Sequence, residues 1–146
     1  MTKNTIPVVF SADANYGYPM IFSVLSMIRH AKEDTRYEFI LLVSHDFPQK
    51  YKDVIDRHAK EADMLVRYID MQDAFEDVNM HIKHITQATY YRLKLPGLLP
   101  DIDKCLYLDV DIVVQNDLTE LYEQDMEEYY IAGVKAAGYY YPPEKK

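Results

Sequence analysis

Apolar runs and amphipathic stretches alternate along this chain, a pattern that predicts β-strands separated by helices. The apolar runs are short and nearly continuous, as in strands that a sheet buries on both faces. After the first two runs, apolar side chains recur at helical spacing behind a proline suited to a first helical turn. The predicted strands are residues 6–10, 37–43, 64–69 and 104–114, and the two helices open at Pro19 and Pro48.

Further elements are predicted in the second half of the chain, beyond an irregular acidic segment at residues 70–79 that suits a loop or a short helix. A helix is expected from about Thr86 to the breaker pair Pro96 and Gly97, which would stop it. The last predicted elements are a helix capped by Asp117 and Glu120 and a strand over residues 131–134.

Strands that alternate with helices at this spacing indicate an α/β fold with a Rossmann-like, mainly parallel sheet and helices on both faces. The length of 146 residues suits one domain. In such sheets, ligands bind outside the carboxyl ends of the strands. Asp13 and Asp109 both follow predicted strands, so we expect functional side chains at that edge.

Composition and charge narrow the choice of partners and compartment. The formal net charge of −8 argues against nucleic acid and against an anionic membrane surface as partners. The single cysteine, Cys105, lies within an apolar run, so the chain forms no internal disulfide and a reducing compartment is expected. The first apolar run is too short for a signal peptide or an anchor. A cytoplasmic protein without a transmembrane segment is therefore predicted.

Asp109 and Asp111 interrupt the apolar run 104–114 and form the strongest candidate site. Burying either carboxylate is costly without a cation or several hydrogen-bond donors, and two anions one residue apart repel each other. A divalent cation is the simplest compensation, and oxygen ligands favour Mg²⁺ or Mn²⁺, which can bridge to nucleotide phosphates. The structural alternative is a strand that ends in two solvated aspartates.

Other polar residues are placed to complete a nucleotide diphosphate site. Asp13 and Asn15 can read a base or ribose, and Tyr16 offers a stacking surface. Lys83 and Arg92 can offset phosphate charge, Arg92 in a bidentate way. Each residue also has a structural alternative, because the loop residues can shape a turn or pack on the next helix and Arg92 can be a solvated helix residue.

Two other chemistries fit parts of the sequence. His81 and His84 are potential zinc ligands, but no cysteine or further histidine completes a set at suitable spacing. The Asp-x-Asp strand also fits phosphatases that use an aspartate nucleophile. Those enzymes usually begin with that strand and use later lysine and acidic residues, whereas only residues 112–146 follow Asp111 here.

Three segments together resemble glycosyltransferase family 8, the retaining GT-A-fold enzymes that include lipopolysaccharide galactosyl- and glucosyltransferases and glycogenin. The resemblance covers nearly the whole chain, in the family's order, and the Tyr-Leu-Asp-x-Asp sequence is its most specific part. The segments are residues 9–16 (VFSADANY), residues 82–86 (IKHIT) with 89–93 (TYYRL), and residues 107–111 (YLDVD).

This resemblance implies retaining transfer of a hexose from UDP-glucose or UDP-galactose to a saccharide or glycolipid acceptor of the lipopolysaccharide type. It implies that Asp109 and Asp111 ligate a Mn²⁺ or Mg²⁺ ion, which acts as a Lewis acid on the UDP leaving group. The loop from Asp13 to Tyr16 would hold uridine, and the two basic residues would contact the diphosphate or the donor sugar. The residues so assigned are Ser11, Ala12, Asp13, Asn15, Tyr16, Lys83, Arg92, Asp109, Val110 and Asp111.

The chain also departs from the family pattern. Family members continue with an Asn-Ala-Gly strand, an Asp-Gln pair near the reacting carbon and a late histidine in the metal shell, and residues 135–138 (KAAG) stand where an aspartate is frequent. We therefore expect residues 1–146 to form a single donor-binding domain, truncated at its C-terminus, in which no catalytic residue can be named. Such a domain would self-associate through the surface left uncovered. A nucleotide-sugar-binding module without turnover is the alternative of a different class.

Overall fold

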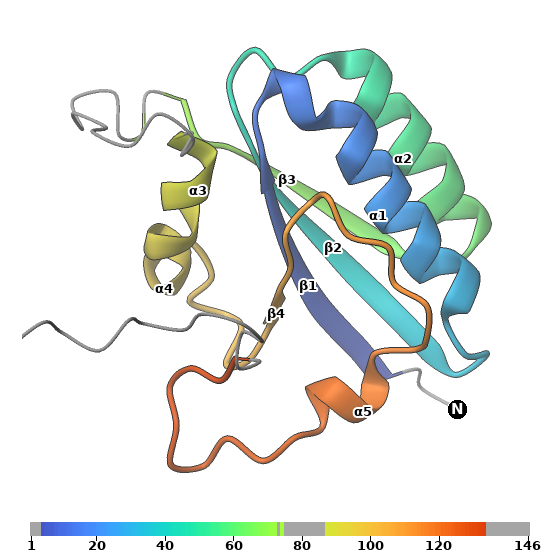
Figure 1. The fold of residues 1–146 in the computed structure, drawn as a ribbon, viewed down its shortest axis with the longest axis vertical. Coiled ribbons are helices and arrows are strands. Elements are labelled where there is room, and N and C mark those ends of the chain that lie inside the picture. Colours follow the sequence, from blue (N-terminus) through green and yellow to red (C-terminus); the bar gives the residue numbers. More distant parts are fainter. Residues whose placement is uncertain (1–3, 73, 75–86, 134–146) are drawn as a thin grey trace, which may run out of the picture.

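A parallel sheet forms the centre of the protein in the computed structural model, which describes residues 4–72, 74 and 87–133. Its described strands lie in the order β3-β2-β1-β4, and each pairs with its neighbours in parallel (Figure 1). This arrangement confirms the predicted mainly parallel sheet. The strands are β1 (Asn4–Ala12), β2 (Thr35–Val43), β3 (Leu65–Asp70) and β4 (Leu106–Tyr107).

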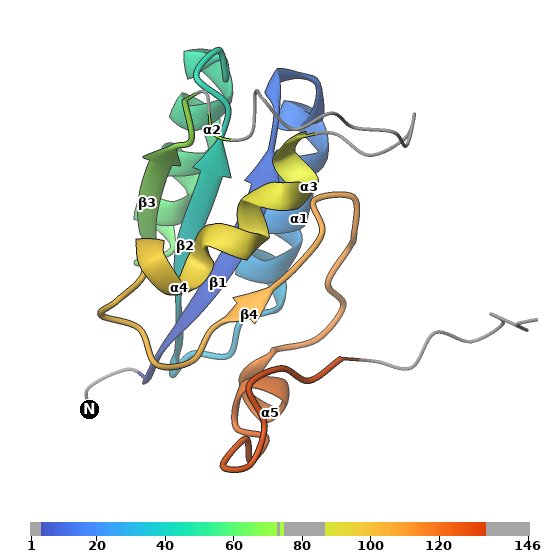
Figure 2. The same ribbon diagram turned by 90° about the vertical axis from the view of Figure 1, so that its left-hand side faces the viewer.

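Helices cover both faces of the sheet, as the sequence predicts. Helices α1 (Gly17–His30) and α2 (Gln49–Glu61) pack on one face. Helices α3 (Gln87–Tyr91) and α4 (Leu95–Leu98) lie on the other (Figure 2). None of the helices in the described part of the chain is long and apolar enough to cross a membrane. The short remaining elements are the 3-10 turns η1 (Ala14–Tyr16) and η2 (Arg92–Lys94) and the helix α5 (Thr119–Tyr122).

Alternation along the strands divides the core between the two faces. Val8 and Phe10 on β1 pack with the residues beneath α1 and α2. Val9, between them in the sequence, belongs to the cluster beneath α3 and α4. The last five residues of β2 are all buried because helices cover this inner strand on both faces, which explains its continuous apolar sequence.

The fourth strand is much shorter than predicted. Only Leu106 and Tyr107 pair with β1, although residues 104–114 form one apolar run. Val110 and Val114 are buried, but they belong to the core cluster that includes α1 rather than to a longer strand. The apolar pattern after Tyr107 therefore reflects packing against α1 and not a longer strand. The predicted strand over residues 131–134 is also wrong for its described part, because residues 131–133 form no strand.

Pro96 and Gly97 do not stop the helix that precedes them. The chain tightens into η2 after α3, and then forms α4, which contains both residues and ends at Leu98. A proline is tolerated there because it lies in the first turn of α4, where backbone N–H groups have no acceptor within the helix.

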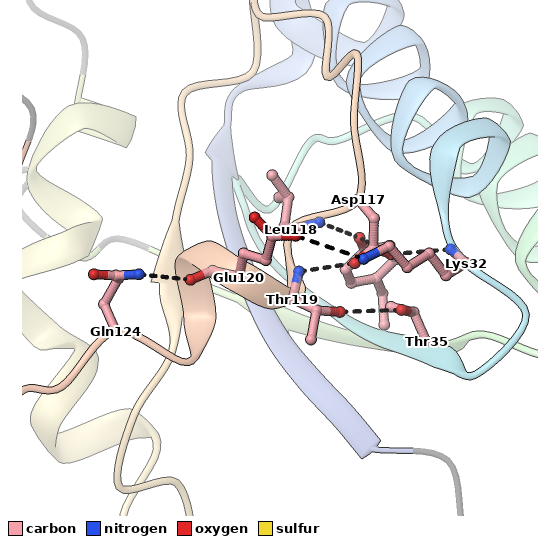
Figure 3. Close-up of polar contacts among 8 residues, drawn as sticks. Lys32, Thr35, Asp117, Leu118, Thr119, Glu120 and Gln124 are labelled. Atoms are coloured by element: carbon pink, nitrogen blue, oxygen red, sulfur yellow. Dashed lines mark hydrogen bonds and ion pairs between the residues drawn. The ribbon is translucent and has the colours of Figure 1, made fainter.

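Asp117 connects the segment after β4 to the start of β2 (Figure 3). One carboxylate oxygen accepts a hydrogen bond from the Thr119 amide (2.9 Å), and the other accepts from the Lys32 amide (3.0 Å) and the Tyr37 hydroxyl (3.3 Å). Helix α5 starts at Thr119, and the exposed Glu120 forms an ion pair with Lys32 (3.8 Å) instead of a reciprocal cap. The predicted capping box is therefore wrong, although Asp117 does satisfy an amide at the helix start.

We expect Asp117→Asn to reduce the free energy of unfolding and to weaken its dependence on pH. Burial opposes ionisation of Asp117, but hydrogen bonds from Thr119 and from the Lys32 amide outweigh it and lower its pKa. A depressed folded-state pKa stabilises the fold above the unfolded value, near 4, and this contribution is lost as the pH falls further. The variant should cost about 1 kcal/mol at pH 7 and show a flatter decline of the free energy of unfolding below pH 4.

Urea unfolding between pH 3 and pH 7 measures this difference. Asp125→Asn is the matched control, because Asp125 also accepts a hydrogen bond from an amide two residues on, in an exposed loop. Equal acid dependence in the two variants and the unaltered chain would contradict the role of Asp117.

Candidate functional site at the carboxyl edge of the sheet

The carboxyl ends of β1 and β4 bring two predicted site segments to one edge of the sheet. Val8 pairs with Leu106 and Val9 with Tyr107, so the two strands run in parallel with their ends at the same edge. The loop that begins at Asp13 follows β1, and Asp109 follows β4 after one intervening residue. The prediction that both aspartates lie at strand ends is confirmed.

Asp109 and Asp111 both face solvent, on either side of a buried residue. Val110 packs into the core with 7% of its surface exposed, whereas the Asp109 side chain is 64% exposed. The cost of burying carboxylates therefore does not apply to this pair, which corrects one argument for a bound cation. The remaining argument for a bound cation is the type of ligand available. Two exposed carboxylates lie one residue apart, on a segment held by its buried middle residue.

Arg92 lies beside Asp109 and is held in place by three contacts. Its guanidinium contacts the Asp109 carboxylate (3.3 Å) and lies 4.4 Å from the centre of the Tyr107 ring. Its Nε donates a hydrogen bond to the Thr89 carbonyl (2.8 Å). Arg92 is therefore more than a solvated helix residue, since its position at the carboxyl edge is set by α3, β4 and Asp109.

Ser11 and Ala12 support the site from within the sheet. The Ser11 hydroxyl is almost buried and forms a 2.5 Å hydrogen bond with the Tyr107 hydroxyl. Ala12 is 1% exposed, and its carbonyl accepts a hydrogen bond from the Ser44 amide. The side chains of these two predicted site residues thus face the protein interior.

The loop after β1 presents its polar side chains to solvent. Asp13 accepts a hydrogen bond from the Asn15 amide (2.8 Å) through its carboxylate and from the Tyr16 amide through its carbonyl. Asn15 is exposed and Tyr16 is 41% exposed. Asp13 therefore shapes the turn, as the structural alternative proposes, while Asn15 and Tyr16 are accessible to a ligand.

Several carboxylates lie near Tyr91 at this edge. Burial raises the pKa of Tyr91, and the negative charges of Asp13, Asp46 and Asp70 raise it further. Asp70 also forms a hydrogen bond with His45 (2.8 Å), and hydrogen bonds from the Gln72 amide and His45 lower its pKa. Such an edge attracts a cation and repels a diphosphate that arrives without one.

The described residues offer a cation two carboxylates and no complete protein cage. No group of three or more His, Cys, Asp or Glu side chains in the described ranges could hold a metal ion. Asp111 makes no hydrogen bond or ion pair with that part of the chain, so its oxygens are open to a ligand. Two carboxylates fit Mg²⁺ or Mn²⁺, which keep waters and bind phosphate oxygens. Lys83, His81 and His84 lie outside the described residues.

Two residues of this region make contacts that the sequence analysis does not predict. Tyr107 links Ser11 to Arg92, and Ser23 on α1 binds the backbone around Asp111. The sequence does indicate a buried hydrogen bond at Ser23, because this serine lies among apolar residues on the inner face of a predicted helix. Tyr107 belongs to the Tyr-Leu-Asp-x-Asp sequence, but its residue type alone does not predict these contacts, since tyrosine is common in strands.

Residues 7–146 match the family model described as Glycosyl transferase family 8. The glycosyltransferase GlyE of Streptococcus pneumoniae is 32% identical over 134 residues, covering 88% of this chain and 31% of GlyE. General stress protein A of Bacillus subtilis is 24% identical over 133 residues, covering 90% of this chain and 46% of that protein. A crystal structure of an active-site mutant of LgtC, 31% identical, has a TM-score of 0.73 over 84% of this chain and 43% of its own. The chain thus spans less than half the length of these relatives.

Proposed function

Because the chain belongs to glycosyltransferase family 8 and has the GT-A fold, we propose that it binds the UDP-sugar donor and divalent cation of a hexosyltransferase. The observation that carries this proposal is the pair of exposed carboxylates Asp109 and Asp111, of which Asp109 contacts Arg92. Family membership also sets aside the phosphatase interpretation of the same Asp-x-Asp sequence.

Charge explains why cation and nucleotide belong together at this edge. Asp109 and Asp111 would hold Mn²⁺ or Mg²⁺, and the diphosphate would supply further oxygens to the ion. The contact between Arg92 and Asp109 is exposed and therefore weak, so a cation can replace it at small cost. Arg92 would then be available for a diphosphate oxygen, with Lys83 as the second basic residue of the proposal.

The loop after β1 would recognise the nucleoside. Asn15 and Tyr16 are exposed beside the strand end, with hydrogen-bonding groups for the base or ribose and a ring on which the base can stack. Asp13 holds this loop in shape through its bond to the Asn15 amide. Ser11, Ala12 and Val110 would contribute through the backbone, because their side chains are buried.

The proposed reaction is retaining transfer of glucose or galactose from the UDP-sugar to a saccharide or glycolipid acceptor. The cation would stabilise the charge that develops on the departing UDP. The residues of this chain would bind and orient the donor, and we assign none of them to the bond-breaking step. A binding module without turnover would use the same residues, and its distinguishing property is UDP-sugar binding without release of the sugar.

Calorimetric titration of UDP, UDP-glucose and UDP-galactose into the 146-residue chain tests the proposal. With Mn²⁺ present we expect binding, and after removal of the ion by a chelator we expect none. ADP with Mn²⁺ is the control for recognition of the uridine. Absence of binding in a sample with a cooperative unfolding transition, or binding that does not depend on the cation, would refute the proposed donor site.

A further inference from the structure

Ser23 lies at the buried centre of α1 and contacts the segment that carries the two aspartates. Its side chain is fully buried, on the same helix face as Met20 and Met27. Its hydroxyl lies 2.6 Å from the Val110 carbonyl and 2.8 Å from the Ile112 carbonyl. A hydroxyl has one proton, so it donates to one of these oxygens or shares the proton between them.

These two carbonyls belong to the residues on either side of Asp111. The Val110 carbonyl is part of the peptide bond that joins Val110 to Asp111, so the Ser23 contact fixes the orientation of that peptide plane. Among the described residues the sheet does not do so, because the last hydrogen bond to β1 comes from the Leu108 amide and the chain then runs alongside α1 (Figures 1 and 2). In the part of the chain that the structure describes, hydrogen bonds to Ser23 thus take the place of pairing with a strand.

A second serine extends the same connection. Ser26, three residues along α1, accepts a hydrogen bond from the Val114 amide (2.9 Å) and donates one to the Ser23 carbonyl (2.7 Å). Val110 and Val114 are themselves buried, so two apolar side chains and two hydroxyls hold this segment on the helix. The exposed carboxylate of Asp111 therefore projects from a backbone of defined orientation.

We propose that Ser23 is a positioning residue, which orients Asp111 for the divalent cation and thereby sets the affinity of the site for it. This inference rests on the proposed function of Asp109 and Asp111. Residues that orient metal ligands typically change metal affinity by about 10- to 100-fold when they are replaced. Because Ser23 acts through the backbone of a loop, we expect roughly a 10-fold effect.

The test measures Mn²⁺ affinity in the presence of saturating UDP, from the electron paramagnetic resonance signal of free Mn²⁺. Ser23→Ala is expected to weaken Mn²⁺ binding roughly 10-fold. Val24→Ala is the matched control, because it also truncates a fully buried side chain of α1 and so also destabilises the fold. It removes no hydrogen bond to the aspartate segment and should leave Mn²⁺ affinity unchanged.

Equal Mn²⁺ affinity in the Ser23→Ala and Val24→Ala variants would overturn the positioning role. If Ser23→Ala does not fold, Ser26→Ala replaces it, with a smaller loss of affinity expected and an unchanged affinity as the contrary result. Asp111→Asn separates this inference from the proposed function. Loss of binding in Asp111→Asn with normal binding in Ser23→Ala refutes the positioning role alone, whereas absence of Mn²⁺ binding by the unaltered chain refutes both.

Discussion

Asp111→Asn is expected to weaken Mn²⁺-dependent binding of UDP by roughly 100-fold, equivalent to about 2.7 kcal/mol. The described part of the chain offers the ion the two carboxylates of Asp109 and Asp111, so removal of one charge eliminates half of the anionic ligands that this part supplies. An amide oxygen is a weaker ligand, while the shape of the side chain hardly changes. Calorimetric titration of UDP with and without Mn²⁺ measures the loss directly.

The control for this result is Asp103→Asn. Asp103 is exposed and precedes β4, whereas Asp111 follows it, so the two variants change net charge equally at opposite ends of one strand. Asp103→Asn should bind UDP as the unaltered chain does. If both variants lost affinity to the same extent, general charge attraction would explain the cation dependence and the ligand role of Asp111 would be wrong.

Gly17→Ala is expected to destabilise the protein by about 2 kcal/mol through overpacking. An added Cβ at Gly17 would lie 2.0 and 2.2 Å from two ring atoms of Tyr51 on α2. This ring cannot easily withdraw, because it packs against Tyr18 (ring centres 5.0 Å apart) and Phe47 (5.8 Å). The backbone at Gly17 is ordinary helix (φ −61°, ψ −45°), so space rather than conformation requires the glycine.

Urea unfolding measures this effect, and Gly97→Ala is its matched control. An added Cβ at Gly97 meets no atom within 4 Å, so that variant should be neutral or slightly stabilising. In a background of Tyr51→Ala, where the obstructing ring is absent, Gly17→Ala should cost less than about 0.5 kcal/mol. A full cost in that background would show that the collision with Tyr51 is not the cause.

The sequence was sufficient to predict three strands and both long helices. The apolar runs at residues 6–10 and 37–43 lie within β1 and β2, because a parallel sheet covered by helices requires continuous apolar segments. The run at residues 64–69 matches β3 from Leu65 onward, and only Met64 lies before the strand. It was not sufficient to predict how short β4 is. The same apolar pattern arises whether Val110 and Val114 pack on a neighbouring strand or on α1, and local periodicity cannot distinguish the two.

The residues of the site could be predicted from the sequence, but most of the contacts between them could not. Asp109 and Asp111 stand out because charges interrupt an apolar run, and the structure places Asp109 beside the predicted Arg92. The bond between Ser11 and Tyr107 joins residues 96 positions apart, and it depends on the adjacency of β1 and β4. Spacing within one segment carries no information about such pairings.

The strand order also has a consequence for how the protein folds. Strands β1, β2 and β3 pair with neighbours in sequence, whereas β4 returns to β1 across most of the chain. Closing that long loop costs conformational entropy, and the few contacts of β4 offset this cost only after the loop has closed. We therefore expect the first three strands and their two helices to form first as a cooperative unit, with β4 added last. Amide hydrogen exchange should then be faster at Leu106 and Leu108 than in β2, since the edge strand can open and reclose while the rest of the sheet stays folded.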